Sequence, residues 1–182
     1  MSTLFKPIQR LQQYQASLHK KRYSPKLILT LGNHENRIDR AVNNDAAKLD
    51  GVISVADLGY ESFGWEVYPF LDTIVVDGIV YSHYFVTGVM GRPVTSPAAL
   101  ISKKHMSCVM GHVQQRGVAY GTRADGKEIK GIFAGACYTH DEDYMGPQGN
   151  KHWRGIWMFH EVQDGQFDEM QISLSYLQKR YG

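Results

Sequence analysis

The chain of 182 residues is long enough for one ordinary domain and short for two. Its composition, 43% hydrophobic and 21% charged, is globular and excludes wholesale disorder. The net charge of +2 does not require a general polyanion-binding surface, although a local basic patch remains open. Two cysteines, Cys108 and Cys137, are too few for a disulfide scaffold and leave either one bridge or free thiols.

No segment approaches the ~18 consecutive apolar residues of a transmembrane helix. The first residues have neither the apolar stretch nor the small-residue cleavage site of a signal peptide. We therefore expect a soluble, cytoplasmic protein with no membrane partner.

The first part of the chain predicts a helix followed by an α/β unit. Residues 7–19 are predicted helical, because Pro7 suits a first turn and apolar side chains recur at helical spacing from Ile8 to Leu18. The continuous apolar run 27–31 predicts a strand buried on both faces. It ends at Gly32-Asn33-His34-Glu35, before a polar helical segment from Asn36 to about Leu49. Ligands gather at the carboxyl ends of such strands.

After about residue 65 the sequence predicts hairpins. Asp-Gly turns between β-rich runs are a strong hairpin signal, and they occur at 77–78, 125–126 and 164–165. A helix over 97–104 and a short apolar strand over 108–110 lie between the first two hairpins. The fold class is therefore α/β, with several antiparallel strands.

Three strand-like runs each end in a polar cluster that contains histidine. The clusters are Gly32-Asn33-His34-Glu35, His83, and Gly111-His112-Val113-Gln114. Neutral imidazoles and an amide oxygen are competent ligands for Zn²⁺, Mn²⁺ or Fe²⁺. The long separations exclude a zinc finger, so the residues would have to converge through the fold. The alternative is three unrelated histidines that cap strands or bond within a core.

This ordered set of motifs resembles the calcineurin-like metallophosphoesterases, and looks most like their phage-type members. The resemblance covers about residues 27–182. It implies a two-sheet β-sandwich flanked by helices, with a two-metal site at the strand ends. By position, Asn33, His83 and His112 resemble the ligands of the second metal, and Gln114 stands where the family usually has a histidine on the first. His34 resembles the catalytic histidine, which protonates the leaving oxygen or steadies the phosphoryl group.

Neighbouring residues have alternative interpretations. Gly32 and Gly111 would let the backbone turn tightly beside the metals. Glu35 resembles an acidic family position, or it makes a local cap. Arg37 would bind the substrate phosphate, or it forms a surface salt bridge. The acidic segment 138–144 is a solvated loop or a cation site, and His140 and His152 are candidates for lining a substrate cleft.

The family's earlier motifs, an Asp-x-His and a Gly-Asp-x-x-Asp type, have no counterpart here. No aspartate precedes Asn33, and the only earlier histidine is His19. We therefore expect a single partial domain over 1–182 that lacks the first strand-helix-strand unit, with an N-terminal helical segment over 1–24. We favour a carboxyl-terminal fragment over a degenerate relative, and expect a homo-oligomer or an upstream segment bound in trans.

Two functions from different classes follow. The first is a metal-dependent phosphoesterase that hydrolyses phosphomonoesters or phosphodiesters, including nucleic acid or nucleotides, and is impaired as an isolated fragment. Its cofactors would be divalent ions (Mn²⁺, Zn²⁺, Fe²⁺ or Mg²⁺), and a phage-encoded chain would work in the host cytoplasm. The second is a non-catalytic metal-binding or interaction domain derived from the same fold.

Overall fold

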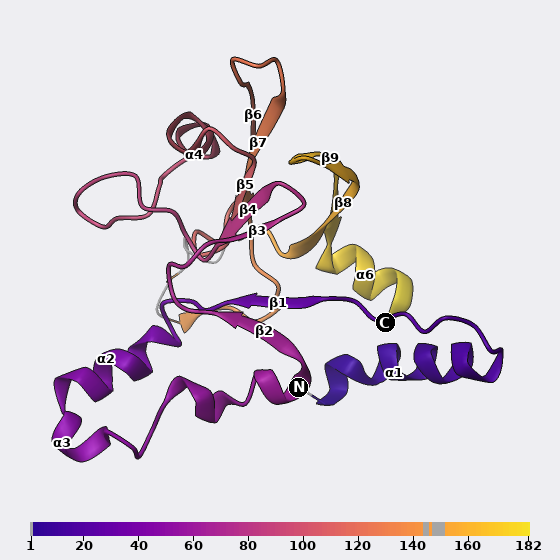
Figure 1. Cartoon of the computed structure of the whole chain (residues 1–182), viewed down its shortest axis with the longest axis horizontal. Coiled ribbons are helices and arrows are strands. Elements are labelled where there is room, and N and C mark those ends of the chain that lie inside the picture. The colour runs from indigo at the N-terminus through magenta and orange to yellow at the C-terminus, as the bar shows by residue number, and fades with distance from the viewer. Residues whose placement is uncertain (1, 144–145, 147–151) are drawn as a thin grey trace. The chain divides into compact units, whose positions relative to one another are not determined.

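The computed structural model describes residues 2–143, 146 and 152–182 (Figure 1). The chain divides into two compact units, Met1–Leu29 with Arg37–Tyr68, and Thr30–Asn36 with Pro69–Gly182. Helices accompany a five-stranded mixed sheet and two two-stranded sheets, so the prediction of an α/β protein is confirmed. One domain over 1–182 stays a prediction.

The first unit and its borders hold helices and one small sheet. Its elements are α1 (Ser2–Ser17), β1 (Leu27–Thr30), α2 (Asn36–Asn44), α3 (Ala46–Leu49), the 3₁₀ turns Val55–Leu58 and Glu61–Phe63, and β2 (Trp65–Tyr68). Among the residues that the structure describes, strands β1 and β2 pair only with each other.

The structure corrects three details of this region. Helix α1 begins at Ser2 and ends at Ser17, so Pro7 lies inside it and the segment 1–24 is helical only in part. Strand β1 is half-buried along its length and not buried on both faces, because it has a single neighbouring strand. The helix predicted over 36–49 is two helices, because Asp45 has extended φ (−140°) between them.

The second unit is built on a five-stranded sheet in the order β3-β4-β5-β7-β6. Strands β4, β5 and β7 run parallel, and the outer strands β3 and β6 are antiparallel to their neighbours. The unit's elements are β3 (Ile74–Val76), β4 (Ile79–Ser82), α4 (Pro97–Lys104), β5 (Cys108–Met110), β6 (Arg116–Thr122), β7 (Glu128–Ala134), β8 (Gly155–Gln163), β9 (Gln166–Ser173) and α6 (Leu174–Tyr181). Helix α4 has the predicted bounds, and Ser96 caps it by accepting a hydrogen bond from the N–H of Ala99.

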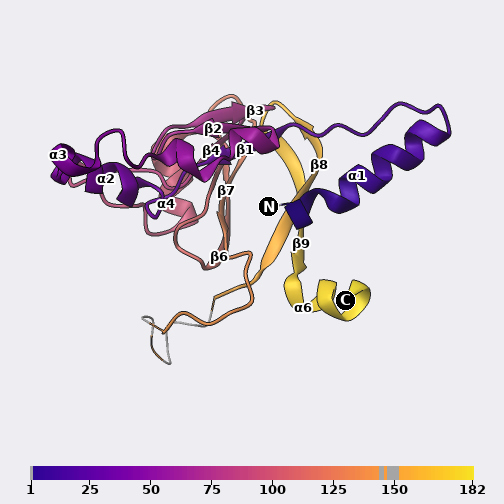
Figure 2. The same cartoon turned by 90° about the horizontal axis from the view of Figure 1, so that it is seen from below.

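Each face of this sheet is covered by a different element (Figures 1 and 2). On one face Leu100 of α4 packs with Val80, Cys108 and Phe133 of the sheet. On the other face Phe167 of the β8–β9 hairpin packs with sheet residues that include Ile132. Alternate residues of the central strands therefore enter two hydrophobic clusters, which is why β5 is buried throughout.

The three predicted hairpins are confirmed. The 77–78 turn joins β3 to β4, the 125–126 turn joins β6 to β7, and the 164–165 turn joins β8 to β9. Both residues of the first and third turns have positive φ, as type I′ turns require. These two turns also touch, because the Gly165 N–H donates to the Asp77 carbonyl at 2.8 Å. The contact joins the β8–β9 hairpin to the edge of the sheet.

The two cysteines are not bonded to each other. Cys108 and Cys137 are free thiols, and burial raises the pKa of Cys108 to about 12, which makes it inert. In the part of the chain that the structure describes, no helix is both long and apolar enough to cross a bilayer.

We predict that Gly78→Ala destabilises the protein by about 1–3 kcal/mol more than Gly126→Ala does. The two glycines have φ of +83° and +82°, so both variants bear the cost of a left-handed backbone. An added Cβ at Gly78 would lie 2.4 Å from the Gly165 nitrogen, whereas at Gly126 it meets open space. Urea unfolding of both variants measures the difference, and equal losses would contradict the turn-to-turn contact.

Candidate metal centre

The parallel pairing of β4 with β5 brings two histidines to one edge of the sheet. The register places Ser82 opposite Met110, the last residues of the two strands. His83 follows β4 directly, and His112 follows β5 by two residues. Their rings lie 5.0 Å apart between centroids.

Asn33 completes a triangle of donor atoms with these histidines. Its Oδ1 lies 2.8 Å from His83 Nε2 and 3.3 Å from His112 Nδ1, and the two ring nitrogens are 3.1 Å apart. All three side chains are half-buried. The sequence-predicted trio, separated by up to 79 positions, therefore converges within one compact unit.

Hydrogen bonding cannot satisfy all three contacts of the triangle. If both ring nitrogens carry protons, both can donate to the Asn33 oxygen, but they then face each other as donors. If His83 donates to His112, the His112 nitrogen faces the Asn33 oxygen as a second acceptor. Three donors around one cation with bonds of about 2.1 Å lie roughly 3.0–3.4 Å apart. Two sides of the triangle, 3.1 and 3.3 Å, lie in that range, and the third, 2.8 Å, is slightly shorter. Two imidazoles with an amide suit borderline divalent ions.

The environment keeps both imidazoles neutral at pH 7. Burial lowers the pKa of His83 to about 4, with further lowering from His112 and His34 against an opposing effect of Glu35. Burial and His34 also lower the pKa of His112. Neutral imidazoles keep the lone pairs that a metal needs.

Aromatic rings that the sequence analysis missed flank the imidazoles. Tyr84 lies 4.9 Å from the His112 ring and 5.8 Å from the His83 ring, between centroids. Phe70 lies 5.8 Å from the His83 ring and 5.5 Å from Tyr84. The adjacency of Tyr84 to His83 was a usable signal, whereas nothing in the sequence pointed to Phe70.

The Gly32 turn holds Asn33 beside His83. The Glu35 carboxylate accepts a hydrogen bond from the Gly32 N–H at 2.8 Å, which is the local cap considered above. A Cβ at Gly32 would lie 2.9 Å from His83 Cε1, so the close approach requires glycine here.

The second glycine of the motifs has no such role. A Cβ at Gly111 would meet only the His83 carbonyl oxygen, at an ordinary 3.9 Å. The left-handed residues of this turn are instead His112 and Gln114, with φ of 56° and 60°. The prediction that Gly111 provides the tight turn is therefore corrected, because the sharp bend lies one residue later.

The remaining predicted site residues lie in different surroundings. His34 is exposed, and it is close enough to lower the pKa values of His83 and His112. Gln114 accepts a hydrogen bond from the Tyr138 hydroxyl at 2.9 Å, and no described contact joins it to the trio. Arg37 is exposed and belongs to the first unit, and none of the described ion pairs includes it. The roles of His34, Gln114 and Arg37 stay predictions.

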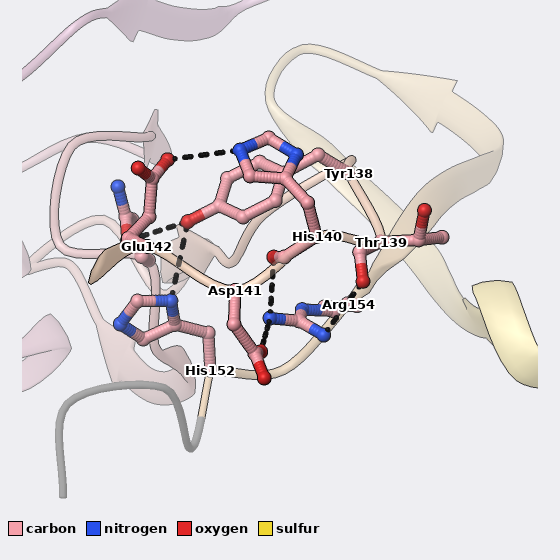
Figure 3. Close-up of polar contacts among 8 residues, drawn as sticks. Tyr138, Thr139, His140, Asp141, Glu142, His152 and Arg154 are labelled. Atoms are coloured by element: carbon pink, nitrogen blue, oxygen red, sulfur yellow. Dashed lines mark hydrogen bonds and ion pairs between the residues drawn. The ribbon is translucent and has the colours of Figure 1, made fainter. Parts of the chain in front are cut away.

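The acidic segment forms a separate polar cluster, drawn in Figure 3. Tyr138 contacts His152, His140 contacts Glu142, and Arg154 pairs with Asp141 at 2.6 Å. Residue 144 lies outside the described residues. Across residues 2–143, 146 and 152–182, no group of three or more His, Cys, Asp or Glu side chains could hold a metal ion. The trio of Asn33, His83 and His112 is not such a group, because one of its three donors is the amide oxygen of an asparagine.

Comparisons of the chain with protein-family models, with curated proteins and with solved structures found no match. The resemblance to the metallophosphoesterases rests on the three motifs.

We predict that the free energy of unfolding falls as the pH drops from about 6.5 toward 4. Folded His83 stays neutral down to about pH 4, whereas unfolded His83 takes up a proton near its ordinary value of 6.5, so acid favours the unfolded chain. Urea unfolding at pH 7.5, 5.5 and 4.5 measures the slope. His83→Gln should flatten it, and the same slope in wild type and variant would contradict the shift.

Proposed function

We propose that this protein is a metal-dependent phosphoesterase, with phosphomonoesters or phosphodiesters, including nucleic acid or nucleotides, as its substrate class. The observation that carries the proposal is the convergence of Asn33, His83 and His112 on one point, with donor separations of 2.8–3.3 Å. His34 is exposed and close enough to influence His112, and it would supply a proton-transfer group.

Asn33, His83 and His112 would hold one divalent ion through the amide oxygen and two ring nitrogens. Two nitrogens and one oxygen suit Mn²⁺, Zn²⁺ or Fe²⁺ better than Mg²⁺, which prefers oxygen ligands. When bound, the ion would supply a positive charge that polarises a phosphoryl oxygen.

Three further features of the site would contribute to catalysis. The imidazole of His34 would act as the general acid and donate a proton to the leaving oxygen, as histidine does in many enzymes. Phe70 and Tyr84 border the imidazoles and would exclude water from that side. The cap from Glu35 to Gly32 would fix the turn that carries both Asn33 and His34.

The arrangement of the five-stranded sheet between a hairpin and a helix supports the proposal. The β8–β9 hairpin packs on one face of the five-stranded sheet, and α4 packs on the other. We interpret these layers as part of a two-sheet metallophosphoesterase-like sandwich. Two of the three motifs, those with His83 and His112, lie at the carboxyl ends of its parallel strands β4 and β5, where such enzymes would bind substrate.

A second candidate function is a metal-binding domain without catalysis. The trio contains no carboxylate, so no acidic side chain among its donors could bridge two ions. A single weakly held ion is what these three donors support.

We predict that the purified chain binds one Mn²⁺ or Zn²⁺ weakly. His112→Ala should remove most of this binding, because it deletes one of three protein donors. His160→Ala, at an exposed position of β8, is the matched control and should bind as the wild type does. Calorimetry and elemental analysis after dialysis measure stoichiometry and affinity, and two tightly held ions would contradict the assignment.

We also predict slow, Mn²⁺-dependent hydrolysis of bis-p-nitrophenyl phosphate. His34→Ala should lower kcat by about 10²–10³ and leave Mn²⁺ affinity unchanged, because His34 acts on the leaving group and is no ligand. His160→Ala again serves as the control. Bound Mn²⁺ without turnover would favour the non-catalytic function, and loss of Mn²⁺ affinity in His34→Ala would contradict its role.

A further inference from the structure

The turn that carries His112 is strained and needs support from outside itself. The Val113 N–H approaches the Gly111 carbonyl at 2.6 Å around His112, which has φ of 56°. A three-residue turn with positive φ at its centre is rare, and a left-handed backbone is unfavourable for a residue other than glycine. Gln114 repeats the strain two residues later, at φ of 60°. Such a backbone persists only where its surroundings hold it.

The Tyr138 hydroxyl holds the Gln114 end of this turn. Its oxygen lies 2.9 Å from Gln114 Oε1 and 3.2 Å from His152 Nδ1. An amide oxygen only accepts, so the hydroxyl proton points to Gln114. His152 then donates from Nδ1 to the hydroxyl oxygen, and the donors run in one direction from His152 through Tyr138 to Gln114.

Tyr138 is itself held by His140 and by Arg154, the residue just before β8. Its ring stacks on His140 at 4.5 Å, and the Arg154 guanidinium lies 5.6 Å from the ring centroid. Arg154 also donates to the carbonyls of Thr139 and His140 and pairs with Asp141. Two backbone hydrogen bonds fix the chain beside Arg154. The Ala136 N–H donates to the Trp153 carbonyl and the Gly155 N–H donates to the Ala136 carbonyl, each at 2.9 Å.

We infer that Tyr138 is a positioning residue for the metal trio: through Gln114 it fixes the turn that aims His112 Nδ1 at His83 and Asn33. The inference rests on the proposed function and deepens it, because it assigns a purpose to Gln114 other than metal ligation. Supporting residues of this kind typically change metal affinity by 10–100-fold.

The test is Tyr138→Phe, which keeps the ring on His140 and Arg154 and removes only the hydroxyl. Tyr176→Phe, at an exposed position of α6, is the matched control. We expect Mn²⁺ affinity to fall about 10–100-fold in Tyr138→Phe and to stay unchanged in the control. Gln114→Leu should lower Mn²⁺ affinity as much as Tyr138→Phe does. The double variant should lose little more affinity than either single variant, because both changes remove the same hydrogen bond.

A second readout needs no metal. In the ¹⁵N-histidine NMR spectrum of the metal-free protein, Tyr138→Phe should shift or broaden the His112 ring signals and leave those of His160 unchanged. An unchanged His112 signal, or a loss of thermal stability with unchanged Mn²⁺ affinity, would overturn the inference. Wild-type protein that binds no Mn²⁺ would refute the proposed function, while the NMR comparison would still decide whether Tyr138 positions His112.

Discussion

The parallel register of β4 and β5 is the constraint on which the candidate site depends. Because Ser82 lies opposite Met110, both strands end at the same level of the sheet. The residues that follow, His83 and His112, then emerge side by side. A shift of one residue in this pairing would exchange the faces of β5 and remove Cys108 and Met110 from the cluster that packs under α4. Core packing and site geometry are therefore fixed by one pairing.

Two turns of the site have unfavourable local geometry, and a contact from another residue supports each of them. The His112 turn has left-handed backbone at two non-glycine residues, and the Gly32 turn tolerates a His83 ring that would clash with any Cβ. Contacts from Glu35 to Gly32 and from Tyr138 to Gln114 supply the compensation. In the proposed metal site, rigid support of this kind would hold the donor atoms in place before an ion arrives, which would lower the cost of binding.

Much of what the sequence determined by itself depends on local chemistry. The three Asp-Gly turns, helix α4 with its Ser96 cap, and the short strand β5 depend on backbone preferences and on side chains within a few residues, so the sequence predicted them correctly. The position just beyond an apolar strand marked the three polar clusters, whereas the choice of Asn33, His83 and His112 as one set came from the resemblance to the metallophosphoesterases. Helix boundaries were less accurate: Asp45 divides the 36–49 segment, and α1 begins ahead of Pro7.

Only the tertiary structure decided what depends on distant neighbours. Strand β1 reads as fully buried, yet it pairs with β2 alone and stays half-buried, because burial depends on how many strands surround it. Phe70 reaches the His83 ring although no motif marks it. Gln114 turns to Tyr138, and the sharp bend falls at His112 and not at Gly111. The contacts of Phe70 with His83 and of Gln114 with Tyr138 join residues that are not neighbours in the sequence, and spacing along a sequence cannot specify which of them meet.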